Sequence, residues 1–191
     1  LIIRNHGNKA AVVPFTLQLH GTNSVLVLSG PNAGGKSVAM KSVGLLQLMV
    51  QAGIPVPVDE SSHFAMYHKF YVDIGDQQSV EDDLSTYSSH LLNMKNVLEG
   101  ADEKTMVLID EFGSGTDPQI GGAIAESILN ELHKRKATVV ITTHYSNLKF
   151  YAFKTKGIVN ASMEFDRAKL SPSYKLIVGK PGSSFAFEIA H

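Results

Sequence analysis

The sequence predicts an α/β fold, with a mainly parallel sheet flanked by helices. Three short runs rich in apolar and β-branched residues, at 24–28, 105–109 and 138–142, are typical of buried strands. Segments with helical periodicity lie between them, at 36–51 and 86–99. Strands that alternate with helices favour parallel pairing, because each crossover between parallel strands needs a connection long enough for a helix.

Length and composition limit the class of protein. A chain of 191 residues supports one sizeable core, so we expect a single domain over 1–191. Apolar residues make up 43% and charged residues 18%, which is typical of a globular protein. The chain does not start with Met, and residues 185–191 resemble the start of a helix, so we expect a fragment of a longer protein.

Charge and residue usage exclude several kinds of site. The chain has no cysteine, which rules out disulfides and thiolate metal sites and leads us to expect a cytoplasmic protein. No run approaches the roughly 20 apolar residues of a membrane span, so we expect no membrane partner. The net charge is −1 and the basic residues are scattered, which argues against a DNA-backbone interface within this chain.

The N-terminal elements surround a glycine-rich run. The strand at 24–28 ends just before Gly30, and the helix at 36–51 has apolar residues on every side, which predicts a buried helix. Gly53 and two prolines end that helix. Residues 69–74 are expected to form the next strand, followed by a polar loop.

The later elements continue the alternation. Gly100 closes the helix at 86–99, and the strand at 105–109 runs directly into two acidic residues. The turn at 113–118 places a proline at the start of another helix. The strand at 138–142 leads to His144. A short helix from residue 147 and strands near 158–165 and 174–178 complete the predicted order.

The glycine-rich run predicts a P-loop nucleoside triphosphatase that binds ATP and Mg²⁺. It matches the pattern G-x-x-x-x-G-K-[ST] with Gly30, Pro31, Asn32, Ala33, Gly34, Gly35, Lys36 and Ser37. Such a loop turns backbone N–H groups toward phosphate oxygens at a helix N-terminus. Lys36 is expected to bridge the β- and γ-phosphates and Ser37 to ligate Mg²⁺. A chance match in a turn is the alternative, which the flanking strand and helix disfavour.

Two acidic residues follow the second predicted strand. Asp110 and Glu111 would lie at the edge of the sheet where the phosphates are expected. Asp110 is expected to hold Mg²⁺, directly or through a water, and Glu111 to orient or deprotonate the attacking water. The alternative is an acidic pair that caps a turn.

His144 follows the third predicted strand and is expected to reach the same edge. Its imidazole could hydrogen-bond the γ-phosphate or the attacking water, although a lone histidine is often structural. Ser85 opens a predicted helix, where its hydroxyl is either an ordinary N-cap or part of a second anion site. The turn at 113–118 alone indicates only flexibility before a helix.

The motifs, taken together, resemble those of MutS ATPase domains. The series is Gly-Pro-Asn-x-Gly-Gly-Lys-Ser, then Ser-Thr-Tyr, Asp-Glu-Phe-Gly-Ser-Gly-Thr-Asp and Thr-Thr-His-Tyr. Three further segments, at 73–79, 88–90 and 159–165, are similar to the second bacterial MutS paralogue, the branch without mismatch-recognition domains. His90 stands where mismatch-repair relatives carry an acidic residue, and its role stays open.

The resemblance implies an ABC-like ATPase that works as a homodimer with each nucleotide between two subunits. Ser85 would then act in trans on the γ-phosphate bound by the partner, and residues 113–117 would cross the dimer interface. Asn32 would contact the γ-phosphate or nearby interface groups. Phe15 matches the position that stacks on adenine in relatives, or is simply an apolar strand residue.

The same resemblance implies a role on nucleic acid through regions outside this chain. The branch is associated with branched DNA, suppression of recombination and rescue of collided ribosomes, and its nuclease activity belongs to a separate Smr domain. We therefore expect an ATPase without nuclease activity. The alternatives are a mismatch-repair MutS ATPase domain that serves mismatched DNA, and a nucleotide-dependent switch with little turnover. A transport or chromosome-type ABC ATPase would need a Leu-Ser-Gly-Gly-like signature, which the sequence lacks.

Overall fold

The computed structural model describes residues 12–19, 21, 23–74, 83–166, 169 and 171–182, and only the backbone of Asn32 and of residues 83–89. The predicted C-terminal helix at 185–191 lies outside the described residues. The elements in chain order are β1 (Val25–Ser29), η1 (Asn32–Gly34), α1 (Lys36–Gln51), β2 (Lys69–Asp73), α2 (Asp83–Gly100), β3 (Thr105–Ile109), α3 (Pro118–Lys134), β4 (Thr138–Thr143), α4 (Ser146–Lys154), β5 (Ile158–Asp166) and β6 (Ser171–Val178).

The sheet is six-stranded, with the order β2-β3-β4-β1-β5-β6. Every neighbouring pair is parallel except β5 and β6, which form an antiparallel pair at one edge. The predicted α/β class with a mainly parallel, helix-flanked sheet is therefore confirmed. The strands β3, β4 and β1, which precede the predicted site residues, are neighbours in the sheet. Their carboxyl ends therefore lie side by side.

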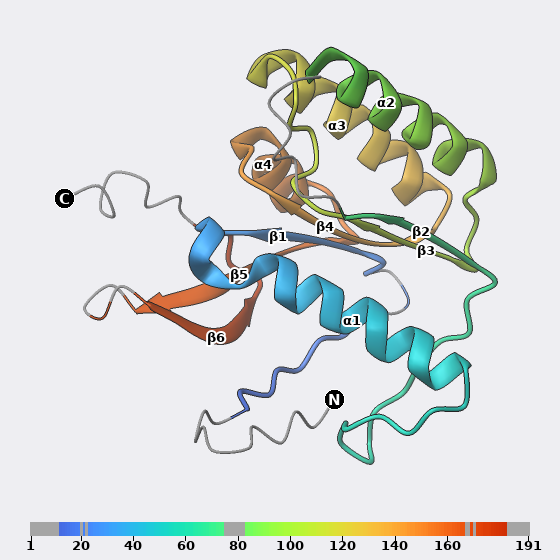
Figure 1. Ribbon diagram of the computed structural model, residues 1–191, viewed down its shortest axis with the longest axis vertical. Helices are drawn as coiled ribbons and strands as arrows, with labels where there is room; N and C mark the ends of the chain where they lie inside the picture. Colours follow the sequence, from blue (N-terminus) through green and yellow to red (C-terminus); the bar gives the residue numbers. More distant parts are fainter. Residues whose placement is uncertain are drawn as a thin grey trace.

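Two apolar cores separate the sheet from its helices, because alternate strand residues point to opposite faces. Val27, Val107 and Ile141 face the helices α2, α3 and α4. Leu28, Leu108 and Val140 face α1 on the other side. Figure 1 shows this three-layer arrangement, with α1 alone below the sheet and the other three helices above it.

The prediction that α1 is buried on all sides is wrong. Its residues Ala39 and Met40 pack against the sheet, whereas Val38 is 59% exposed and Leu48 is 44% exposed. The apolar composition of the helix gives no sign of this difference, because both faces carry residues of the same kind. Among the described residues, nothing covers this outer face.

Most other boundaries differ from the predicted ones by one to three residues. The helix α2 begins at Asp83, so Ser85 lies in its first turn and is not an N-cap residue. An acidic residue in the first turn is favoured by the helix dipole, which accounts for the earlier start. The predicted helix start at the turn is confirmed, since the Asp117 side chain accepts hydrogen bonds from the backbone N–H groups of Gln119 and Ile120.

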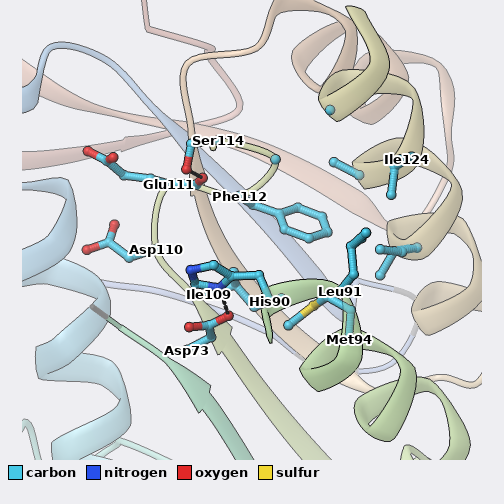
Figure 2. Close-up of a pocket in the computed structure, with 14 residues that line it drawn as sticks. Asp73, His90, Leu91, Met94, Ile109, Asp110, Glu111, Phe112, Ser114 and Ile124 are labelled. Carbon is cyan, nitrogen blue, oxygen red and sulfur yellow. Dashed lines mark hydrogen bonds and ion pairs between the residues drawn. The ribbon is translucent and has the colours of Figure 1, made fainter. Parts of the chain in front are cut away.

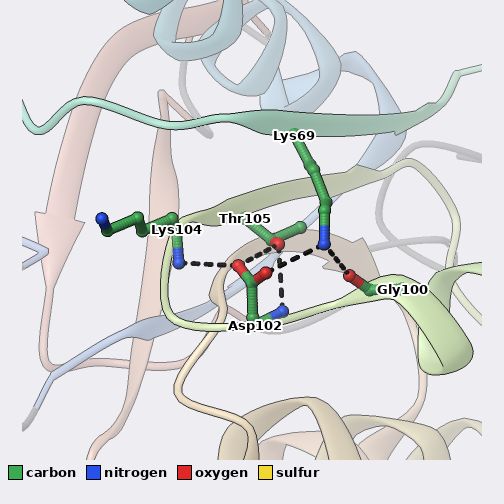
Figure 3. A network of polar contacts seen from close by, with 5 residues as sticks. All are labelled: Lys69, Gly100, Asp102, Lys104 and Thr105. Atoms are coloured by element: carbon green, nitrogen blue, oxygen red, sulfur yellow. Dashed lines mark hydrogen bonds and ion pairs between the residues drawn. The ribbon is translucent and has the colours of Figure 1, made fainter.

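A polar network holds the first residue of β2 to the last turn of α2 (Figure 3). Lys69 Nζ donates to the Gly100 carbonyl oxygen at 2.8 Å and to Asp102 Oδ2 at 2.9 Å. Hydrogen bonds from Lys69, Thr105 and the Lys104 backbone lower the pKa of Asp102 to about 2. The edge strand and α2 are thus linked at the amino end of the strand, far from the loop that follows β1.

Of the helices described, none has the length and apolar character needed to cross a membrane.

Candidate functional site

The candidate site lies at the carboxyl ends of β1, β3 and β4. The glycine-rich loop follows β1, the pair Asp110 and Glu111 follows β3, and His144 follows β4. The charges of these residues act on one another. Both carboxylates oppose the lowering of the Lys36 pKa by burial, and Lys36 adds to the lowering of the His144 pKa by burial. The structure therefore brings together four residues from three segments that are far apart in the sequence.

The loop from Gly30 to Ser37 connects β1 to α1 through one 3₁₀ turn. Gly35 has φ of 89°, a left-handed conformation that glycine adopts without strain, immediately before the first residue of α1. Lys36 Nζ donates to the carbonyl oxygens of Gly30 and Pro31, both at 2.9 Å. The lysine side chain is thus folded back over its own loop.

Lys36 is a buried cation, with only 3% of its surface exposed. Burial lowers its pKa to about 8, and the opposing attraction of Glu111 and Asp110 limits the shift. An ammonium group held at this depth is suited to an anionic ligand, because an additional negative charge would offset its lost hydration.

Two residues from the C-terminal part of the chain lie against this loop, and the sequence patterns did not indicate them. A Cβ on Gly35 would lie 3.0 Å from Cδ1 of Tyr174, so the tyrosine ring covers the loop at that point. Tyr174 has φ of 58°, an uncommon conformation for a residue with a side chain. The Gly182 N–H donates to Ser29 Oγ at 2.8 Å, which fixes the segment after β6 beside Gly30.

A hydrogen-bond scaffold positions the two carboxylates after β3. Thr142, fully buried on β4, donates from its hydroxyl to Asp110 Oδ1 and accepts from the Glu111 backbone N–H at 2.9 Å. The Asp110 N–H donates to the Asp73 carbonyl oxygen at 2.9 Å. Glu111 has φ of 49°, and Ser114 closes the turn by donating to its carbonyl oxygen. Thr142 is a site residue that the strand pattern alone did not identify.

The loop after Glu111 is held against α3 by a close backbone approach. A Cβ on Gly121 would lie 2.3 Å from the Gly113 carbonyl oxygen, and the Tyr145 hydroxyl donates to the same oxygen at 2.9 Å. Gly113 itself has φ of 94°. The turn is therefore an ordered structure with specific contacts.

We expect Gly121→Ala to lower the free energy of unfolding by about 1–3 kcal/mol, because the added methyl group must displace a backbone carbonyl. That loss exceeds the gain of roughly 1 kcal/mol that alanine gives within a helix. Urea unfolding measures the difference, and Gln119→Ala on an exposed position of the same helix is the control. Equal stability of Gly121→Ala and the wild type would contradict this packing.

His144 is half-buried at the end of β4. Its Nε2 is fully shielded and makes no hydrogen bond to any described residue. Burial first, and then the positive charges of Lys36 and Lys149, lower the pKa of its imidazole, while Asp110 opposes this shift. A neutral imidazole with an unpaired nitrogen is able to donate to, or accept from, a ligand at the same sheet edge.

This lowered pKa predicts how stability depends on pH. Because the unfolded imidazole has a higher pKa, the unfolded chain binds more protons, and stability falls as the pH drops below about 6.5. We expect His144→Asn to reduce this loss, as shown by urea unfolding between pH 7.5 and 5.5. His63→Asn, which changes an exposed histidine, should retain the wild-type dependence. An unchanged slope in His144→Asn would contradict the shift.

A hollow lies behind the two carboxylates, between the end of β3 and the helices α2 and α3. Its apolar wall includes Met94, Phe112 and Ile124. Figure 2 shows the carboxylates of Asp110 and Glu111 directed away from this wall, on the side where α1 lies. His90 of α2 stands at the rim, with Nδ1 2.8 Å from Asp73 Oδ2.

Three other predicted site residues have a different status. The side chains of Asn32 and Ser85 lie outside the described residues, so their roles stay predictions. Phe15 is half-buried and packs against the core beneath α1, with residues 12–19 alternating between exposed and half-buried positions. This packing accounts for its apolar character and leaves its predicted contact with adenine untested.

Comparisons with known proteins agree with this geometry. The family model "MutS domain V" matches residues 26–191. The chain is 51% identical over 179 residues to "Endonuclease MutS2" of Bacillus velezensis and to the protein of that name in Exiguobacterium sibiricum. It is 50% identical over 179 residues to "Putative endonuclease MutS2" of Bacillus subtilis.

Each alignment covers 94% of this chain but only 23% of the relative, so the chain spans about a quarter of the length of these proteins. The glycine-rich loop, both carboxylates and His144 all lie within the residues that the family model matches. The chain therefore belongs to the MutS family, as an ATPase domain of its MutS2 branch.

Proposed function

We propose that this chain binds and hydrolyses ATP as the single motor domain, over residues 1–191, of a longer MutS2-type protein. The observation that carries the proposal is the convergence of the glycine-rich loop, Asp110, Glu111 and His144 at three adjacent strand ends. In parallel α/β sheets, ligands bind at this edge. The fold is then of the P-loop type, related to ABC ATPases.

The loop supplies the triphosphate site. In such a loop, backbone N–H groups at the start of the helix would bind the phosphates, and the helix dipole would add to their attraction. Lys36 would exchange its bonds to the Gly30 and Pro31 carbonyls for the β- and γ-phosphate oxygens. Its burial makes that exchange favourable, because the phosphates neutralise a poorly hydrated cation.

The residues present fit a magnesium ion. The Ser37 hydroxyl and the Asp110 carboxylate are oxygen ligands, the class that Mg²⁺ takes, and the structure holds Asp110 in place through Thr142. When bound, the ion supplies charge neutralisation for the phosphates. Asp110 keeps its second carboxylate oxygen for an ion or an ion-bound water, since Thr142 donates to Oδ1.

Glu111 and His144 are assigned to the attacking water. The carboxylate of Glu111 would accept its proton, and its side chain, which follows the turn that Ser114 closes, points to the side of the sheet where α1 lies. Nε2 of His144 would hydrogen-bond the γ-phosphate or the same water. The neutral state of the imidazole allows it to serve as either donor or acceptor.

MutS-family proteins bind DNA and act as dimers, and we propose composite nucleotide sites in a homodimer of this chain. Ser85 of one subunit would reach the γ-phosphate held by the other, and residues 113–117 would cross the interface. Asn32 would contact the γ-phosphate and Phe15 the adenine. ATP binding would close the two domains, and hydrolysis would reopen them to move a clamp elsewhere in the protein.

The biological setting is proposed from the branch to which the chain belongs. Branched DNA, or a ribosome, would be bound by regions outside this chain, in suppression of recombination or in rescue of ribosomes. The relatives are named endonucleases. We assign no nuclease activity to this domain, because the residues that converge here are those that a nucleotide requires.

Calorimetry with MgATP and a phosphate-release assay test the proposal on the natural protein that contains this chain. We expect micromolar to millimolar ATP binding and slow turnover, with a rate per chain that rises with protein concentration as dimers form. Binding without phosphate release would instead support a conformational switch. Failure to bind ATP at all would overturn the proposal.

A further inference from the structure

The helix α2 is tied to the edge strand β2 at both ends of that strand. At the amino end, Lys69 Nζ donates to the Gly100 carbonyl oxygen in the last turn of α2. At the carboxyl end, His90 Nδ1 meets Asp73 Oδ2 at 2.8 Å, with the side chains 29% and 19% exposed. An ionised carboxylate only accepts hydrogen bonds, so Nδ1 carries the proton.

Asp73 connects this tie to the candidate metal site through its backbone. Its carbonyl oxygen accepts the Asp110 N–H at 2.9 Å, while its carboxylate accepts the His90 ring N–H. One residue therefore links the carboxylate after β3 to the middle of α2. Figure 2 shows the His90 ring between Asp73 and Asp110, at the rim of the hollow.

The packing under α2 makes this tie important. The hollow lies between α2, α3 and the end of β3, and apolar side chains such as Leu91 and Met94 form part of its wall. Apolar packing has no strong directional preference, so it tolerates small shifts of a helix that a hydrogen bond to a fixed partner resists. The Asp73–His90 contact is thus a directional constraint on the position of α2 relative to Asp110.

Ser85 lies five residues before His90 on the same helix, roughly 7.5 Å along its axis. We propose that His90 is a positioning residue that couples the nucleotide site of its own subunit to Ser85, and so to the nucleotide site of the partner. The inference rests on the proposed composite site. A ligand that shifts Asp110 moves Asp73 through their shared hydrogen bond, and His90 transmits that shift to α2.

The coupling predicts a separation of turnover from binding. His90→Phe keeps an aromatic ring but removes the N–H donor, so we expect kcat to fall by roughly 5-fold or more. The affinity for MgATP, measured by calorimetry, should stay within about twofold, because the loop around Lys36 is unchanged. His90→Asn retains an amide N–H near the position of Nδ1 and should recover most of the loss.

A double-mutant cycle with Ser85→Ala, read out as kcat, separates action through Ser85 from a general loss of structure. If His90 acts through Ser85, then adding His90→Phe to the Ser85→Ala variant should lower kcat almost no further. Lys69→Met loosens the other end of the same helix and is the matched control. It should lower thermal stability slightly and leave kcat near the wild-type value.

The result that overturns the inference is an equal loss of kcat from His90→Phe in both backgrounds, a parallel loss of ATP affinity, or no loss at all. Failure of the proposed function gives a different result. The wild type would then show no turnover, or Ser85→Ala would have the same kcat as the wild type. Thermal denaturation of every variant confirms that each has folded before its kinetics are compared.

Discussion

Glu111→Gln is expected to bind MgATP with nearly wild-type affinity and to turn it over about 10²–10⁴ times more slowly. The amide has the size of the carboxylate but cannot accept the proton of the attacking water. The contacts that hold this residue, from Thr142 and Ser114, involve its backbone and are kept in the variant. Rapid-quench measurement of a single turnover separates the chemical step from product release.

Glu131→Gln is the control for this prediction, because Glu131 is a partly exposed acid on α3, away from the site. It should retain wild-type turnover. A single-turnover rate for Glu111→Gln equal to that of the wild type would remove Glu111 from the role of base. A loss of ATP affinity without a change in rate would assign it to binding instead.

Lys36→Ala should weaken MgATP binding by roughly 10- to 150-fold, the equivalent of one or two hydrogen bonds to a charged group. The lost ammonium is buried and directed into the loop, so solvent cannot replace it. Calorimetry measures the affinity, with Lys41→Ala as a control on an exposed residue of the same helix. Lys36→Met keeps the apolar stem and tests the charge alone.

The outcome for the two Lys36 variants distinguishes two explanations. Equal losses in Lys36→Ala and Lys36→Met indicate that the ammonium group carries the effect. A loss in Lys36→Ala alone indicates that the apolar stem supports the shape of the loop, since Lys36→Met also lacks the ammonium group that bonds the Gly30 and Pro31 carbonyls. Undiminished affinity in both variants would exclude Lys36 from phosphate binding.

Local patterns predicted the parts of the site that depend on neighbours in the sequence. The glycine-rich loop lies between a strand and a helix, and Asp110 and Glu111 follow a buried strand, because short-range turn chemistry and apolar periodicity determine both features. Because the strands of a parallel sheet have their carboxyl ends at one edge, these patterns also predicted that the three motifs lie together.

Contacts between distant segments could not be predicted in the same way. Thr142 is one of several apolar-strand threonines, and only the register of β4 beside β3 makes it the partner of Asp110. Tyr174 and Gly182 reach the loop from the other end of the chain through the antiparallel strand β6. Which side of α1 stays exposed likewise depends on how the helix packs on the complete sheet.

Mixed dimers of Lys36→Ala and Ser85→Ala chains test the composite site most directly. Each homodimer lacks one required group in both sites. A mixed dimer regains one intact site, in which Ser85 of the Lys36→Ala chain completes the loop of the Ser85→Ala chain. Random mixing of equal amounts makes half of the dimers mixed, so the account predicts that phosphate release recovers to about a quarter of the wild-type rate. A mixture no more active than the average of its two parents would contradict it.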